Sequence, residues 1–166
     1  MEGPSVRCGE SPGTKKKLET LRKGKKVVLC GGVFDIIHPG HAFVLEKAKE
    51  HGDLLVVIIA RDSTVESRKR IPIVPESQRL EMIKHLKPVD IAMFGKEGGF
   101  LEIIEEIRPD VIALGPNQSH DAGEMGAKLK KMGIPTKIVR IEKFKECPLH
   151  STKDILQKII ERGYPR

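Results

Sequence analysis

The stretch Gly31-Gly32-Val33-Phe34-Asp35-Ile36-Ile37-His38-Pro39-Gly40-His41 decides the fold of this chain. It follows the apolar run 27–30 and precedes a helix-like stretch, 41–51. A strand is therefore expected to end in two glycines, cross a short loop and enter a helix at the second histidine. Glycines permit close backbone approach, and the free N–H groups of a helix N-terminus attract anions. With two imidazoles in the same loop, the pattern predicts a phosphate-binding site.

The rest of the chain alternates apolar runs with amphipathic stretches. The runs expected to form strands are 27–30, 54–60, 91–94, 111–114 and 137–141. The stretches expected to form helices are 41–51, 75–86, 99–107, 121–132 and 151–161. Buried runs rich in Val and Ile between amphipathic helices are typical of parallel sheets. We expect an α/β fold: a single Rossmann-like domain with a parallel five-stranded sheet and helices on both faces.

The net charge of +7 is concentrated at the N-terminus. Residues 1–26 hold eight basic and three acidic residues, which accounts for +5 of that charge. Because this segment is rich in Gly, Pro and Ser, we expect residues 1–25 to be a flexible basic leader and residues 26–166 to be the folded domain. A role in solubility explains the basic charge of this leader better than nucleic-acid binding does.

The three cysteines and the hydropathy of the chain indicate the cellular compartment in which we expect the protein. Cys8, Cys30 and Cys147 form no CxxC pair, so neither a disulfide framework nor a zinc site is indicated. No apolar run approaches the roughly 20 residues that a membrane-spanning helix needs. We expect a cytoplasmic protein without membrane contact.

Candidate ligand contacts follow several of the expected strands, where open α/β sheets gather their ligands. Arg61 directly follows the second strand, and Asn117 lies in the turn after the fourth. Asp35 and Arg79 are further candidates for phosphate or acceptor contacts, although Asp35 could equally hold its turn and Arg79 could border the core.

A second anion site is expected where the last helix begins. Ser151, Thr152 and Lys153 combine two hydroxyl groups, a cation and the free N–H groups of a helix start. Phe144, in the preceding loop, could pack on a base or in the core. A metal site at His38 and His41 is the weaker alternative, because no third His, Cys or paired carboxylate lies nearby in the sequence.

Taken together, these motifs resemble the HIGH-motif nucleotidyltransferases of the cytidylyltransferase-like group. Residues 32–35 resemble the GTFD signature of that superfamily, residues 38–41 its HxGH motif, and residues 150–153 its C-terminal phosphate motif. Further segments are similar to archaeal-type FAD synthases, which transfer AMP from ATP to FMN: 59–65, 86–90, 115–118 and 147–151. The resemblance covers roughly residues 26–162.

The resemblance implies roles for individual residues. His38, His41 and Lys153 would be catalytic, by binding the triphosphate and stabilising the transition state. The implied ATP-binding residues are Val33, Phe34, His38, Pro39, Gly40, His41, Asn117, Phe144, Ser151 and Thr152. Three positions depart from the pattern: Val33 replaces the usual Thr, Asn117 stands where Asp is frequent, and Lys153 only approximates an Arg further into the helix.

The implied reaction is a direct in-line attack of the FMN phosphate on the α-phosphorus of ATP, which releases pyrophosphate. A divalent cation, Mg²⁺ or Co²⁺, would be carried mainly by the ATP phosphates, with no dedicated protein metal site. A homodimer is common in the superfamily.

Three alternatives remain at this stage. The same chemistry could use CTP or ATP with another phosphomonoester, such as glycerol phosphate, phosphopantetheine or a sugar phosphate. The chain could also be a nucleotide- or RNA-binding module without turnover. A dinucleotide-binding oxidoreductase is disfavoured because the first turn has no GxGxxG.

Overall fold

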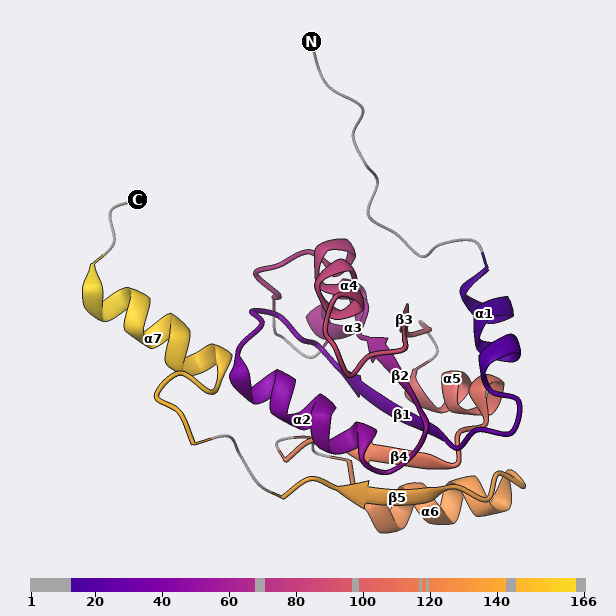
Figure 1. The fold of residues 1–166 in the computed structure, drawn as a ribbon. Helices are drawn as coiled ribbons and strands as arrows, with labels where there is room; N and C mark the ends of the chain where they lie inside the picture. Colours follow the sequence, from indigo (N-terminus) through magenta and orange to yellow (C-terminus); the bar gives the residue numbers. More distant parts are fainter. Residues whose placement is uncertain are drawn as a thin grey trace.

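A parallel sheet of five strands forms the centre of the computed structural model, which describes residues 13–67, 71–96, 99–116, 118, 120–142 and 146–163. The strands are β1 (Val27–Gly32), β2 (Leu54–Ile59), β3 (Ile91–Phe94), β4 (Val111–Leu114) and β5 (Lys137–Arg140). Their order is β3-β2-β1-β4-β5 (Figure 1). The strands β2 and β3 are added on one side of β1 and the strands β4 and β5 on the other, so the strand order reverses between β1 and β4. The expected fold class is confirmed. This reversal places the loop after β1 at the point where such sheets bind ligands.

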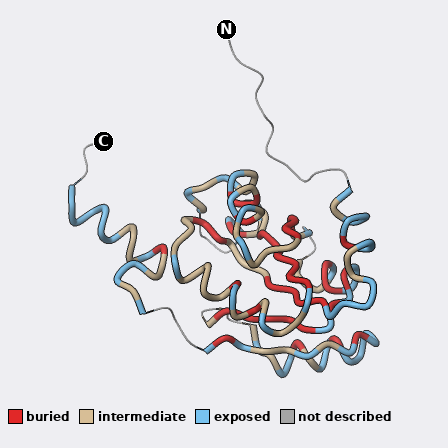
Figure 2. The backbone as a smooth tube through the Cα atoms, viewed as in Figure 1, coloured by how far each residue is buried: buried red, intermediate tan, exposed pale blue. Residues whose placement is uncertain are grey.

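Helices cover both faces of the sheet. They are α1 (Thr14–Leu21), α2 (Pro39–Lys49), α3 (Asp62–Glu66), α4 (Glu76–Lys84), α5 (Phe100–Ile107), α6 (Ala122–Lys131) and α7 (Thr152–Arg162). Buried side chains of α1, α5 and α6 form one apolar cluster with the sheet, and those of α2 and α4 form a second cluster on the opposite face. All six residues of β2 are buried, as expected for a strand covered on both sides (Figure 2).

The last helix differs from the others because it projects from the body of the molecule (Figure 1). Only Thr152 is buried among its residues, whereas Ile159 and Ile160 are exposed. Its contact with the body is therefore made at its N-terminal end. None of the helices among the described residues is long and apolar enough to cross a membrane.

The expectation of a flexible leader up to residue 25 is wrong for its second half. Residues 14–21 form α1, and Leu18 is buried against the sheet. Lys17 Nζ donates to the carbonyl oxygen of Asp90 at 3.1 Å, and Arg22 Nη1 donates to that of Ile107 at 2.9 Å. Residues 1–12 lie outside the described residues. The folded domain thus begins before residue 26.

We predict that Leu18→Ala lowers the free energy of unfolding by about 2 kcal/mol, because it removes buried apolar volume from the contact of α1 with the sheet. Urea denaturation measures the change. Glu19→Ala is the matched control, because Glu19 is exposed on the same helix. Equal effects of the two substitutions would show that α1 does not stabilise the domain.

Candidate active site

The loop between β1 and α2 is held in one conformation by close packing. A Cβ at Gly32 would lie 2.9 Å from the ring of Phe34, and Phe34 itself is buried with a positive φ of 52°. Non-glycine residues adopt this left-handed region at a cost of roughly 1–3 kcal/mol, and such strain is concentrated at functional sites. The ring of Phe34 meets that of His41 edge-on, with centroids 5.3 Å apart. The loop therefore positions His41 directly.

His38 caps the helix that carries His41. Its Nδ1 accepts a hydrogen bond from the backbone N–H of His41 at 3.3 Å, and the two imidazole rings stack with centroids 3.7 Å apart. Because Nδ1 acts as the acceptor, the proton of the neutral ring lies on Nε2. His38 thus holds a hydrogen-bond donor at the N-terminus of α2.

The start of α7 lies against the start of α2. A Cβ at Gly40 would lie 2.2 Å from the backbone carbonyl oxygen of His150, so only glycine permits this approach. Ser151 caps α7 by accepting from the backbone N–H of Asp154 at 3.1 Å, and its hydroxyl donates to the Asp154 carboxylate at 2.5 Å. Thr152 is buried and Lys153 is exposed. The two helix starts predicted to bind anions are therefore adjacent in space.

The electrostatics of His38 reflect this contact. Burial lowers the pKa of His38 from its ordinary value of 6.5, the nearby His150 lowers it further, and Asp154 acts in the opposite direction. The ring of His150 is held by the carbonyl oxygen of Cys147, 2.9 Å from Nδ1. The sequence placed His150 only in the C-terminal phosphate motif and did not single out Asp154, because the effect of both residues on His38 depends on the packing of two helices that are distant in sequence.

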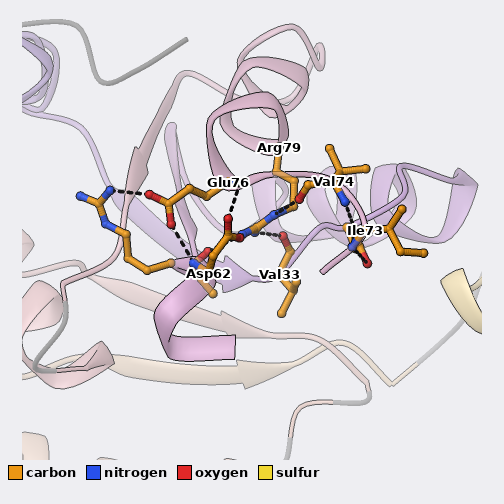
Figure 3. Close-up of polar contacts among 9 residues, drawn as sticks. Val33, Asp62, Ile73, Val74, Glu76 and Arg79 are labelled. Atoms are coloured by element: carbon orange, nitrogen blue, oxygen red, sulfur yellow. Dashed lines mark hydrogen bonds and ion pairs between the residues drawn. The ribbon is translucent and has the colours of Figure 1, made fainter. Parts of the chain in front are cut away.

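Arg79 and Asp35 brace the loop that precedes the histidines, and Figure 3 shows the contacts of Arg79. The guanidinium of Arg79 is completely buried and donates to the carbonyl oxygens of Val33 at 2.5 Å and Val74 at 2.9 Å. It also donates to the carbonyl oxygen of Ala60 at 2.9 Å and to the carboxylate of Asp62 at 2.5 Å.

Asp35 is also buried, and its carboxylate accepts from the backbone N–H groups of Ile73 and Val74, the shortest bond being 2.8 Å. These positions do not fit the expected phosphate or acceptor contacts of Arg79 and Asp35, because their polar groups are bonded inside the protein. Both residues instead join the loop after β1 to the segment before α4.

Arg61 differs from Arg79 because it reaches a cavity. The side chain of Arg61 is 34% exposed, and its Nη1 donates to Glu76 at 2.9 Å. It lines a cavity of about 800 Å³ at the carboxyl ends of β2 and β3. Arg61 therefore remains a candidate for an acceptor contact.

The turn after β4 is fixed next to β1. Gln118 donates through Nε2 to the carbonyl oxygen of Gly31 and accepts from the backbone N–H of Gly115 at 3.1 Å. Arg140 donates to the carbonyl oxygens of Gly115 and Gln118 at 3.2 and 2.9 Å. Asn117 and Phe144, the predicted nucleoside contacts, lie outside the described residues, so their roles stay predictions.

No group of three His, Cys, Asp or Glu side chains suited to a metal ion occurs within the described ranges. Cys30 and Cys147 are free cysteines. Burial raises the pKa of the Cys30 thiol to about 12, so this cysteine is an unreactive part of the core.

A parallel sheet that presents two adjacent helix starts beside a stacked pair of histidines is the arrangement of a nucleotidyltransferase-like protein. The chain belongs to the cytidylyltransferase-like family, whose model matches residues 29–158.

Curated relatives define its place in that family more narrowly. The chain is 56% identical over 134 residues to the FAD synthase of Methanothermus fervidus, which covers 79% of this chain and 92% of that protein. It is 53% identical over 135 residues to the FAD synthase of Methanobrevibacter ruminantium, with 80% and 90% covered.

Solved structures agree on the fold. A Thermoplasma volcanium structure described as a lipopolysaccharide core biosynthesis protein superimposes with a TM-score of 0.72 at 46% identity, covering 74% of this chain and 100% of that one. The pantoate-β-alanine ligase of Francisella tularensis superimposes with a TM-score of 0.59 at 17% identity, covering 77% and 63%, and this likeness shows the fold alone.

We predict that the His38 imidazole titrates below pH 6.5 in the ligand-free protein and that bound tripolyphosphate raises its pKa, because an anion favours the protonated ring. Between the lowered pKa and pH 6.5 the unfolded chain binds more protons, so His38 makes the free energy of unfolding fall as the pH drops through this window. An NMR titration of the histidine Cε1–H signals measures the pKa. A His38 pKa above 6.5 without ligand would contradict the described environment.

We predict that Arg79→Met lowers the free energy of unfolding by about 3 kcal/mol, because it leaves the carbonyl oxygens of Val33, Ala60 and Val74 without this donor and separates Asp62 from its partner. Urea denaturation provides the measurement. Arg162→Met, on exposed α7, is the control. Equal stability of the two variants would show that the buried network does not hold the loops.

Proposed function

We propose that this protein transfers AMP from ATP to FMN, producing FAD and pyrophosphate. The observation that carries the proposal is the contact of Gly40 with the His150 carbonyl, which brings the starts of α2 and α7 together. Two helix N-termini and two imidazoles at one place suit a triphosphate. The FAD synthases that resemble this chain over most of its length support ATP and FMN as the substrates.

In the proposed reaction, a phosphate oxygen of FMN attacks the α-phosphorus of ATP. A bond forms between that oxygen and the α-phosphorus, the bond to the bridging oxygen of the β-phosphate breaks, and pyrophosphate leaves. A phosphomonoester has its second pKa near 6, so FMN is largely dianionic at neutral pH and needs no protein base. Catalysis then consists of positioning and charge stabilisation.

The described residues divide this work. His38 would donate from Nε2 and His41 from its ring to phosphate oxygens where negative charge accumulates. The backbone N–H groups at the start of α7 and the exposed Lys153 ammonium would hold the leaving pyrophosphate. Val33 and Phe34 would line the nucleotide, with Asn117 and Phe144 as further expected contacts.

A divalent cation, Mg²⁺ or Co²⁺, would neutralise charge on the phosphates. In the described part of the chain no three-ligand cluster offers it a site, and Mg²⁺ commonly binds through substrate phosphates. We therefore propose that ATP carries the cation. We further propose that the enzyme is cytoplasmic and binds neither membrane nor nucleic acid. A homodimer stays a prediction.

The first experiment measures product formation by the purified protein with ATP, FMN and Mg²⁺ or Co²⁺. We expect FAD and pyrophosphate in equal amounts, with none formed when FMN is omitted. Reactions with CTP, and with glycerol phosphate or phosphopantetheine as acceptors, are the comparison. Turnover of one of these pairs without FAD formation would keep the chemistry and contradict the flavin acceptor.

We predict that His41→Ala lowers kcat by about 100- to 1000-fold, as expected when one preorganised donor to a charged transition state is lost. The control is His85→Ala, because the His85 side chain is 72% exposed at the end of α4. Steady-state kinetics and thermal denaturation measure activity and folding. A loss below about fivefold in a folded variant would contradict the catalytic role.

A further inference from the structure

The cavity of about 800 Å³ lies at the same carboxyl edge of the sheet as the histidine loop and takes no part in the reaction described above. Gly32 pairs with Ile59 and Ile59 pairs with Phe94, so these three residues form one row across the carboxyl edge of the sheet. Phe94 and Gly95 line the cavity at one end of this row, and the histidine loop begins at the other. Neighbouring strands lie about 4.8 Å apart, so the cavity begins roughly 10 Å from the loop.

Arg61 forms a flat, fixed surface in this cavity. Its guanidinium carbon lies 4.1 Å from the centroid of the Phe94 ring. Glu76 accepts from Nη1 at 2.9 Å, and the carbonyl oxygen of Gly95 accepts from Nε at 3.3 Å. The guanidinium is thus held by an aromatic ring and two acceptors, yet the side chain stays 34% exposed. A planar cation fixed in this way is suited to stacking on a second aromatic system.

The remaining walls differ in polarity. Met93, Ile103 and Pro75 supply apolar surface. The opposite rim carries Glu106 between two lysines, with Lys15 Nζ at 2.6 Å and Lys96 Nζ at 2.5 Å. Hydrogen bonds from Lys15 and Lys96 lower the pKa of the Glu106 carboxyl, so this rim offers both ammonium donors and a carboxylate acceptor.

We infer that this cavity is the subsite for the isoalloxazine ring of FMN, with the ring stacked on the Arg61 guanidinium. The inference rests on the proposed function and adds where the acceptor lies. An isoalloxazine is planar and has an apolar dimethyl edge, which suits the apolar wall of the cavity. Its opposite edge carries alternating carbonyl and N–H groups, which suit the rim of ammonium and carboxylate groups. The ribityl chain spans roughly 8–10 Å from ring to phosphorus at about 1.5 Å per bond, close to the separation of cavity and loop. The FMN phosphate therefore reaches the start of the histidine loop while its ring occupies the cavity.

Arg61 is accordingly a specificity-determining residue for the acceptor. Two variants test this. Arg61→Lys keeps the charge and removes the planar group, and Ser77→Trp fills the cavity from the first turn of α4. Arg22→Lys is the matched control, because Arg22 also donates to backbone carbonyl oxygens but does not line the cavity.

The first measurement is the fluorescence anisotropy of riboflavin, which has the ring and lacks the phosphate. The second is the KM for FMN and for ATP. We expect both cavity variants to bind riboflavin at least about tenfold more weakly and to raise the KM for FMN by a similar factor, with the KM for ATP unchanged. Arg22→Lys should match the wild-type protein.

Wild-type riboflavin affinity and KM for FMN in both cavity variants would overturn the inference and leave the proposed function intact. Equal losses for FMN and ATP would also overturn it, because they would indicate a structural role for Arg61. A wild-type protein that neither binds riboflavin nor forms FAD would contradict the proposed function itself.

Discussion

The contact between Gly40 and the His150 carbonyl is the constraint on which the site depends. It brings together two helix starts that are more than a hundred residues apart in sequence. Each start has backbone N–H groups without partners inside its own helix, and together they concentrate positive potential at one place. Any side chain at position 40 would separate the two helices. Burial, and after it the nearby His150, lower the pKa of His38, so the unliganded site favours a neutral ring.

The strain in the histidine loop is balanced by bonds from other parts of the fold. Phe34 adopts a positive φ, and the backbone on either side of it is held by Arg79 at Val33 and by Asp35 through Ile73 and Val74. A buried arginine with a carboxylate partner and several carbonyl acceptors is a costly arrangement unless every bond is made. Its bonds hold three loops at the carboxyl edge in fixed relation to one another, as preorganised catalysis requires.

The sequence predicted the sheet and the helices on its two faces, because these depend on local periodicity and on the chemistry of helix starts. It failed for α1, where Leu18 and Leu21 are the only apolar residues of a lysine-rich segment and the packing partner is distant. The sequence left the role of Arg79 open, because the residue pattern of α4 places this side chain at the edge of the core and gives no sign of the carbonyl groups that converge on it. The influence of His150 and Asp154 likewise arises from tertiary packing alone.

A crystal structure of the protein with a non-hydrolysable ATP analogue and Mg²⁺ tests the account most directly. We predict that the triphosphate lies between the starts of α2 and α7, with oxygens within hydrogen-bond distance of His38 and His41. A triphosphate bound elsewhere, or one that contacts α2 while α7 lies apart from it, would contradict the claim that the two helix starts form a single phosphate site.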